Sequence, residues 1–194
     1  MTAKRHRLSV EERRAQLLEL ALELFSNRPY DEISIDEIAQ AAGISKGLLY
    51  HYFQGKRGFY LAAVDRAAQQ LLAETDVEPA TQSEPDLDAV RTSIQRYLTF
   101  VEERSASYSF LMRGAMAQDA EVQAVVERTR RAILDRMLRR VGSGPPMLRT
   151  ALRGYIGLVE AASLDWLEHR DVSKEALTDL LVKACVHTVS LALS

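Results

Sequence analysis

Most of this chain consists of segments in which apolar residues recur three and four positions apart, separated by short breaks rich in glycine, proline or polar residues. Such spacing places the apolar side chains on one face of a helix, so the pattern predicts an all-α fold of about nine helices. Two capping boxes mark helix starts near the N-terminus, at Ser9-x-x-Glu12 and Ser34-x-x-Glu37. In each box the serine and the glutamate satisfy backbone N–H groups of the first turn.

The segment 34–56 predicts two short helices joined by a tight turn. The first helix begins near Ile35, and Gly43 supplies the left-handed backbone that ends it. Ser45 is the N-cap of a second helix that runs to about Phe53. A helix, a short turn with glycine and a second helix are typical of a helix-turn-helix unit, whose second helix enters the DNA major groove.

The second helix of this unit has two different faces. One arc carries hydrogen-bonding groups and an open backbone, at Lys46, Gly47, Tyr50, His51 and Gln54. The other arc carries the residues expected to pack, at Leu48, Leu49, Tyr52 and Phe53. No Asp or Glu occurs from Ile38 to Val64, although the whole chain has 25 basic and 27 acidic residues. A local basic window of this kind suits a phosphate-facing surface, whereas the alternative is a short helix that only covers a core.

The run SIDEIAQAAGISKGLLYHYFQGK resembles the DNA-binding domain of the tetracycline repressor (TetR) family of bacterial regulators, and the resemblance covers residues 10 to about 70. It implies an N-terminal three-helix DNA-binding domain, residues 1–56 with the start of the fourth helix. It also implies a C-terminal helical bundle for ligand binding and dimerisation, residues 57–194. One position departs from the family pattern, because Tyr52 stands where a histidine usually precedes the phenylalanine.

The DNA contacts expected from this resemblance fall into two groups. Major-groove contacts are assigned to Lys46, Gly47, Tyr50 and His51. Backbone contacts are assigned to Ser34, Ser45, Tyr52 and Lys56, since hydroxyl groups and a lysine at a helix N-terminus can hold phosphate. For the basic tail 1–8, a solvated terminus and an arm along the DNA stay as alternatives.

Five further helices are expected in the second domain, after a proline-containing acidic linker at 75–86. Their predicted ranges are 87–104, 107–118, 122–141, 147–169 and 173–193. The helix 122–141 carries six arginines, for which a solvated face paired with acidic neighbours is favoured over a second DNA surface. These arginines are Arg128, Arg130, Arg131, Arg136, Arg139 and Arg140.

Aromatic and methionine residues are more abundant in the second domain than packing alone requires. They are interpreted as the lining of an apolar cavity, with plain core packing as the alternative for each residue. The candidate pocket residues are Tyr97, Phe100, Tyr108, Phe110, Met112, Arg113, Met116, Tyr155 and Trp166. Arg113, Arg153 or Asp165 is expected to orient the ligand. The family resemblance implies a small, often lipophilic effector in this domain.

The last two predicted helices have apolar faces that are too broad for one small bundle to cover. The resemblance implies that they pair with a second copy in a four-helix dimer interface. The candidate interface residues are Leu152, Ile156, Val159, Leu177, Leu181, Cys185 and Thr188. A twofold dimer presents two recognition helices about 34 to 36 Å apart, so the expected operator is near-palindromic double-stranded DNA.

Composition excludes several other classes of protein. The single cysteine rules out an intrachain disulfide, and no uninterrupted apolar run reaches 18 residues. We therefore expect a cytoplasmic protein without a membrane partner. Cys185 and His187 point about 200° apart on a helix, and the four histidines lack metal-ligand spacing, so neither an enzyme, a metal site nor a cofactor is expected.

The favoured function is a ligand-responsive transcriptional repressor that a small lipophilic inducer releases from its operator. Two alternatives stay open at this stage. One is a helical dimer that binds small molecules and has no DNA function. The other is a regulator that needs a corepressor or that activates transcription.

Overall fold

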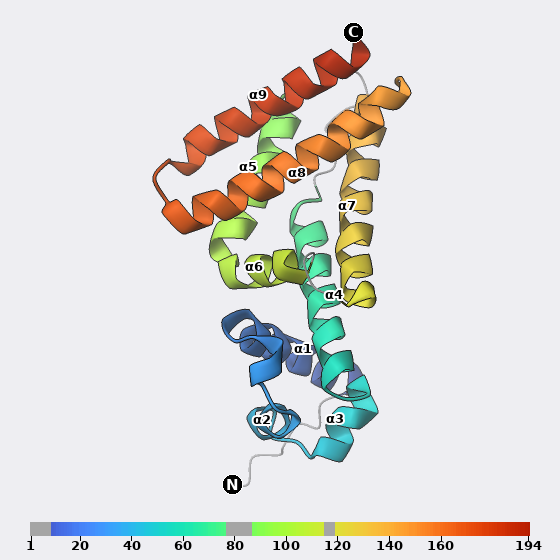
Figure 1. Ribbon diagram of the computed structural model, residues 1–194, viewed down its shortest axis with the longest axis vertical. Helices are drawn as coiled ribbons and strands as arrows, with labels where there is room; N and C mark the ends of the chain where they lie inside the picture. Colours follow the sequence, from blue (N-terminus) through green and yellow to red (C-terminus); the bar gives the residue numbers. More distant parts are fainter. Residues whose placement is uncertain (1–8, 77–86, 115–118) are drawn as a thin grey trace, which may run out of the picture. The chain divides into compact units, whose positions relative to one another are not determined.

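The computed structural model describes residues 9–76, 87–114 and 119–194. In these residues the chain forms nine α-helices and one 3-10 turn, and no strand, which confirms the predicted all-α fold (Figure 1). The contacts divide the chain into two compact units, Met1–Ala67 and Ala68–Ser194. The functional boundary expected at 56/57 stays a prediction, and the tail 1–8 and the linker residues 77–86 lie outside the described residues.

Unit 1 is made of helices of which α1, α2 and α3 start at the capping residues seen in the sequence. The elements are α1 (Val10–Asn27), η1 (Tyr30–Glu32), α2 (Ile35–Ala41), α3 (Lys46–Phe53) and α4 (Lys56–Glu74), the last of which continues into unit 2. Both predicted capping boxes are present, at Ser9 and at Ser34. Gly43 has a φ of +62°, which confirms the left-handed turn between α2 and α3.

An aromatic cluster fills the core of unit 1. The ring of Phe59 lies 4.9 Å from that of Phe53 and 5.9 Å from that of Phe25, centroid to centroid. Leu49 and Ile38 are fully buried beside them. This core fixes α3 on the unit through its inner face, because Leu49 and Phe53 are both α3 residues.

Gly58 makes the junction between α3 and α4 possible. A Cβ atom at this position would lie 1.7 Å from the carbonyl oxygen of Phe53, which belongs to the backbone and cannot move aside. The first turn of α4 therefore approaches the end of α3 more closely than any side chain allows. Sequence reasoning passed over this glycine, because its role depends on a contact between two helices.

Unit 2 contains the end of α4 and five further helices. They are α5 (Leu87–Glu103), α6 (Ser105–Gly114), α7 (Ala120–Val141), α8 (Pro146–His169) and α9 (Lys174–Leu193). Asp119 and Ser173 cap α7 and α9 as expected. The long helices α8 and α9, orange and red in Figure 1, lie side by side, and both also contact α5.

The residues predicted to form a dimer interface lie mostly inside the chain. Leu152, Ile156, Leu177, Leu181 and Cys185 are each at most 8 % exposed, because they pack between the helices of unit 2, while Val159 and Thr188 are half-buried. Their apolar spacing marked the core of the bundle, so assigning these five to a contact surface was wrong. The exposed apolar side chains of the two helices are different ones: Met147, Leu158, Leu164, Leu180, Val186, Leu191 and Leu193.

Helix α9 has an unusual balance of composition and burial. Among the described residues, α9 meets the length and composition criteria for a membrane-spanning helix. Only 28 % of its most apolar stretch is buried within the chain. It packs on α8 and α5 along one side. Much of its apolar surface is therefore left without a cover in the single chain.

Candidate nucleic-acid interface and ligand cavity

The outer face of α3 carries four of the predicted DNA-contacting residues. Lys46, Gly47, Tyr50 and His51 are all exposed, and Tyr50 retains 53 % of its surface. The buried α3 residues hold the helix from the opposite side, so this face is rigidly presented. Leu48, which the helix wheel placed among the packing residues, is 38 % exposed, because the first turn of α3 extends past the core.

Acidic and aromatic neighbours hold the two lysines of this surface. The Lys46 ammonium forms an ion pair with Asp36 of α2, in which both side chains are more than half exposed. The Lys56 ammonium lies 4.0 Å from the centre of the Tyr30 ring. Solvent-exposed pairs of this kind contribute at most about 1 kcal/mol, so a phosphate or base edge can replace them.

The hydroxyl-bearing candidates have structural partners. Ser34 and Ser45 accept hydrogen bonds from backbone N–H groups at the starts of α2 and α3, with N to Oγ distances of 3.1 and 3.2 Å. Tyr52 is half-buried, and its ring centre lies 5.7 Å from that of His51. Gly47 is open, because a Cβ there would find its nearest neighbour, the Ser45 hydroxyl, 3.9 Å away.

The capping box of α2 also has an electrostatic signature. The backbone N–H of Ser34 donates to Glu37, and Arg28 donates to the same side chain at 2.9 Å. These hydrogen bonds, with the backbone bond as the largest cause, lower the pKa of Glu37 from its ordinary value near 4.5 to about 2. Glu37 is therefore ionised at any physiological pH and fixes the start of α2.

Unit 2 contains a half-open cavity of about 180 Å³ among α4 to α9. Four of the nine residues predicted for a ligand pocket line it, namely Tyr97, Tyr108, Met112 and Tyr155. Phe100, Phe110, Arg113 and Trp166 do not line it, and Met116 lies outside the described residues. The rest of the lining comes from five helices, α4 with the residue after it, α5, α7, α8 and α9: Leu71, Thr75, Val90, Ser93, Ile94, Ile133, Arg136, Met137, Arg140, Val141, Ile156, Val159, Glu160 and Cys185.

A pair of tyrosines forms one polar part of this largely apolar wall. The hydroxyl oxygens of Tyr97 and Tyr108 are 2.6 Å apart, and the Ser163 hydroxyl donates to the Val159 carbonyl beside them. Burial, together with the negative charge of Glu160, raises the pKa of both phenols well above the usual range. Both tyrosines are therefore neutral, and they share one hydrogen bond with each other.

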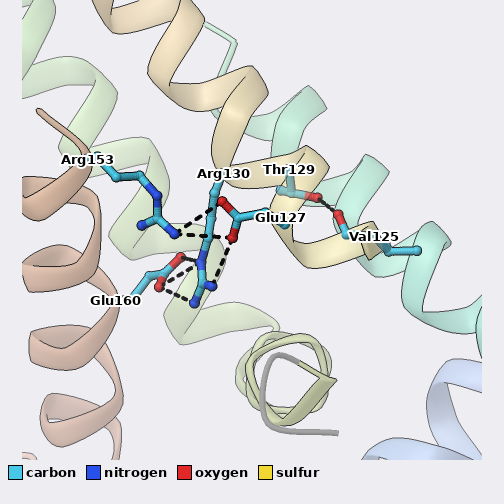
Figure 2. A network of polar contacts seen from close by, with 6 residues as sticks. All are labelled: Val125, Glu127, Thr129, Arg130, Arg153 and Glu160. Carbon is cyan, nitrogen blue, oxygen red and sulfur yellow. Dashed lines mark hydrogen bonds and ion pairs between the residues drawn. The ribbon is translucent and has the colours of Figure 1, made fainter. Parts of the chain in front are cut away.

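An ion-pair network holds the carboxylate of Glu160 at the cavity (Figure 2). Arg130 of α7 binds both oxygens of this carboxylate, at distances of 2.8 to 3.2 Å. Glu127 in turn accepts from Arg130 and from Arg153 of α8. Arg153 was expected to orient a ligand, but it is engaged in this network, and the charge of Glu160 is neutralised by Arg130.

Two further arginines of α7 line the cavity. Arg136 donates to the backbone carbonyl of Leu72 at 2.8 Å and lies 3.5 Å from the carboxylate of Asp76. Arg140 donates to the hydroxyl of Ser93 at 2.9 Å. The prediction of a solvated arginine face on α7 therefore holds for most of the six arginines, since only Arg130 and Arg136 are half-buried, against α8 and α4.

The remaining candidates have ordinary structural roles. Tyr155 donates to the carbonyl of Leu181 at 3.0 Å, and burial raises the pKa of the Cys185 thiol. Asp165 is exposed and lies near His169. In the part of the chain that the structure describes, no group of three metal-ligating side chains occurs.

Comparison with known proteins agrees with this geometry. The family model described as "Bacterial regulatory proteins, tetR family" matches residues 17–63, and "Tetracyclin repressor-like, C-terminal domain" matches residues 86–188. The second model alone covers more than half of the chain. The chain therefore belongs to the TetR family and is a DNA-binding transcriptional regulator, which confirms the resemblance read from the recognition helix. Members of this family are regulators and not enzymes.

Two named relatives are similar to this chain over more than half of its length. The transcriptional activator FasR of Mycolicibacterium smegmatis is 28 % identical over 90 % of this chain and 81 % of its own length. The regulator EthR of Mycobacterium tuberculosis is 30 % identical over 62 % of this chain and 55 % of its own length.

Solved structures show the same architecture. A tetR-family regulator from Streptomyces coelicolor is 38 % identical with a TM-score of 0.81, covering 95 % of this chain and 83 % of that one. A TetR-like regulator from Rhodococcus sp. RHA1 is 26 % identical with a TM-score of 0.75, covering 95 % and 99 %.

Proposed function

We propose that this regulator is a cytoplasmic homodimer that binds a near-palindromic operator through α3 and changes its DNA affinity when a small lipophilic molecule enters the cavity of unit 2. The observation that carries the proposal is the exposed face of α3, with Lys46, Gly47, Tyr50 and His51 presented together on a buried anchor. Side chains on such a face can donate to guanine and adenine edges in the major groove. Gly47 adds an open stretch of backbone at which a base edge can approach.

Backbone contacts would surround this reading face. Lys56 stands at the N-terminus of α4, where the backbone N–H groups and the helix dipole favour a phosphate. Ser34, Ser45 and Tyr52 lie on the adjoining elements and can donate hydroxyl protons to phosphate oxygens. The tyrosine at position 52 gives this chain a phenol where the family pattern has an imidazole.

The exposed surface of α8 and α9 supports a dimer. Leu158 and Leu180 are 45 % and 57 % exposed, and Gly154 and Gly157 have nothing within 4 Å of a built Cβ. Glycines that no neighbour in the chain requires allow a second pair of helices to approach closely. A twofold contact there would also cover the apolar face of α9 that the single chain leaves uncovered.

Repression is the favoured sign of regulation, with the effector acting as an inducer. A coupling of about 1 to 3 kcal/mol between the cavity and DNA, or 5- to 150-fold in affinity, is sufficient to switch a promoter. Activation is the second candidate, because the relative FasR is named an activator. Both require the same DNA-binding dimer and differ only in what the bound protein does to the polymerase.

The DNA proposal is tested by recovering the genomic fragments that the purified protein retains and footprinting them. We expect protected half-sites related by a twofold axis and centred about one helical turn apart. A reporter placed behind the recovered promoter then gives the sign, since deleting the regulator raises expression for a repressor and lowers it for an activator. Retention of no fragment above background would overturn the proposal.

The dimer is tested by analytical ultracentrifugation of the wild type and of Leu180→Glu. We expect a dimer at micromolar concentration for the wild type and a monomer for the variant, because a charge would be buried in an apolar contact. Val10→Glu places the same charge on another exposed apolar residue, in α1, and should stay dimeric. A monomeric wild type, or a dimeric Leu180→Glu, would rule out this interface.

A further inference from the structure

The charged groups at the cavity are distributed unevenly. Apart from the phenols and the Cys185 thiol, three ionisable side chains line the cavity. One of them, Glu160, is neutralised by Arg130, as described above. The other two are Arg136 and Arg140, one turn apart on α7. The cavity therefore has an apolar body with two guanidinium groups at one part of its wall, where Arg136 pairs with the exposed Asp76 and Arg140 donates to Ser93.

This positive part lies well away from the Glu160 end. Arg136 and Arg140 follow Arg130 by six and ten residues on one continuous helix, roughly 9 and 15 Å of helix rise. Ile133, Met137 and Val141 occupy the same face of α7 and also line the cavity. An elongated ligand would thus meet cationic groups at one end and apolar side chains along its length.

The chain itself shows which head group suits Arg136. The carboxylate of Asp76 lies 3.5 Å from its Nη2 atom, and the Asp76 side chain is 63 % exposed while the Arg136 side chain is 24 % exposed. A planar guanidinium has five donors in a fork that matches a carboxylate. A loosely held, solvent-exposed aspartate is a weak competitor for this fork, so a ligand carboxylate can take its place.

The size of the cavity limits the rest of the ligand. An engineered apolar cavity of about 150 Å³ binds benzene, so 180 Å³ accommodates an apolar body of about six to eight carbons. We propose that the cavity binds a medium-chain monocarboxylate, with its carboxylate on Arg136 and Arg140 and its chain along Ile133 and Met137. This inference rests on the proposed function, whose effector class it names.

Arg136 also connects this site with α4. Its Nη1 atom donates to the carbonyl of Leu72, in the last turn of the helix that runs from Lys56 to Glu74. A ligand on Arg136 therefore competes for a side chain that holds the end of α4. The bound head group and the last turn of this helix are joined through one guanidinium.

The test is binding of three eight-carbon probes to the full chain in the absence of DNA, by calorimetry and thermal shift. We expect octanoate to bind at least tenfold more tightly than 1-octanol and octyltrimethylammonium not to bind, since a hydrogen bond to a charged group is worth about 1.5 to 3 kcal/mol. Equal binding of octanoate and octanol, preference for the cation, or no binding of any probe would overturn the proposal.

Variants locate the head group. Arg136→Met should weaken octanoate at least tenfold while octanol changes less than twofold, and Arg140→Met should weaken octanoate at least threefold. Arg139→Met is the matched control, because Arg139 is exposed on the same helix and does not line the cavity. If Arg136→Met does not fold, Arg140→Met decides, and unchanged octanoate affinity in the deciding variant contradicts the site.

The two proposals fail in different ways. Octanoate binding without a head-group preference would remove the carboxylate site and leave the DNA-binding dimer intact. Failure to retain any genomic fragment would remove the proposed regulation, whereas the calorimetry on the protein alone would be unaffected.

Discussion

The two units of this regulator present their chemistry in opposite ways. In unit 1 the candidate DNA contacts lie outside, on α3, and the interior is an aromatic core with Phe53 and Phe59 at its centre. In unit 2 the candidate ligand contacts lie inside, and polar side chains such as Glu160 and Tyr108 are held by partners from other helices. A surface that meets DNA needs only a rigid anchor, whereas a cavity that meets a ligand needs each buried polar group satisfied.

The difference predicts that unit 1 is most sensitive to backbone geometry and unit 2 to its ion-pair network. Gly58→Ala tests the sensitivity of unit 1 to backbone geometry. We expect a loss of about 3 kcal/mol or more in the free energy of unfolding, because a Cβ at this position meets the Phe53 carbonyl at 1.7 Å. Urea denaturation followed by circular dichroism measures it.

Gly47→Ala is the matched control for Gly58→Ala. Its new methyl group meets nothing closer than 3.9 Å, so the free energy of unfolding should stay equal or rise by up to about 1 kcal/mol. DNA affinity should fall, since the methyl group fills the open backbone of the reading face. Equal stability of the two alanine variants would contradict the close approach of α3 and α4.

Arg130→Met tests the dependence of unit 2 on its ion-pair network. We expect a loss of about 2 to 3 kcal/mol in the free energy of unfolding, less than the 3 to 5 kcal/mol of a fully buried pair, because Arg130 and Glu160 are 22 % and 16 % exposed. A double-mutant cycle with Glu160→Gln should show that the two losses do not add. Arg91→Met, which breaks an exposed pair with Asp179, should cost less than about 1 kcal/mol.

Lys46→Ala separates reading from stability in unit 1. We expect sequence discrimination at one base pair of each half-site to fall by about 1 to 3 kcal/mol, measured by competition binding with mismatched operators. The free energy of unfolding should change by less than about 1 kcal/mol, since the pair with Asp36 is exposed.

Lys56→Ala is the comparison for Lys46→Ala. It should weaken binding to all sequences evenly and reduce the slope of affinity against salt by about one ion. If Lys46→Ala left binding to every mismatched operator unchanged, the outer arc of α3 would not be the reading face.

The smallest expected effect concerns pH. Because the pKa of Glu37 is lowered to about 2, its stabilising contribution is complete above its ordinary value near 4.5 and is lost as pH falls towards 2. Glu37→Gln should therefore flatten the decrease in melting temperature between pH 5 and pH 2.5. A slope identical to the wild type would show that the capping box does not contribute.

Glu102 in unit 2 is the counterpart of Glu37 for a pH-dependent contribution to stability. Its pKa is also lowered, chiefly by the hydrogen bond from Lys174 and the charge of that lysine, with a smaller contribution from Arg170. Salt screens exposed ion pairs, so 0.5 M NaCl should remove most of the effect of Glu102→Gln on the pH slope. The effect of Glu37→Gln should persist, because its largest cause is a backbone hydrogen bond of a helix cap.

Local chemistry explains why unit 1 could be read so far from its residues. Caps at Ser9, Ser34 and Ser45, together with the left-handed Gly43, act within four positions of the chain, and the structure has each of them as predicted. Helix periodicity likewise separated the buried Leu49 and Phe53 from the exposed Tyr50. Such signals are complete within one segment, so no other part of the fold is needed to interpret them.

In unit 2, signals within one segment were not enough to predict the contacts between helices. A periodic apolar stripe says that a face is covered but not by which partner, so Leu152 and Leu181 were assigned to a second copy although the chain's own helices cover them. Arg136 and Arg140 share a face of α7 with Ile133 and Met137, which was a signal that these arginines lie at the cavity. Their partners, Leu72 and Ser93, lie 64 and 47 residues away in the chain.

The sequence by itself determined the helices, their caps, the family resemblance and the exposed face of α3, because each depends on residues within one or two turns of one another. Only the tertiary structure decided which apolar faces are core, where the cavity lies, and which cations enter it. Burial and ion pairing between helices are set by side chains that are distant along the chain. The need for glycine at position 58 is of the same kind, since it comes from the crossing of two helices.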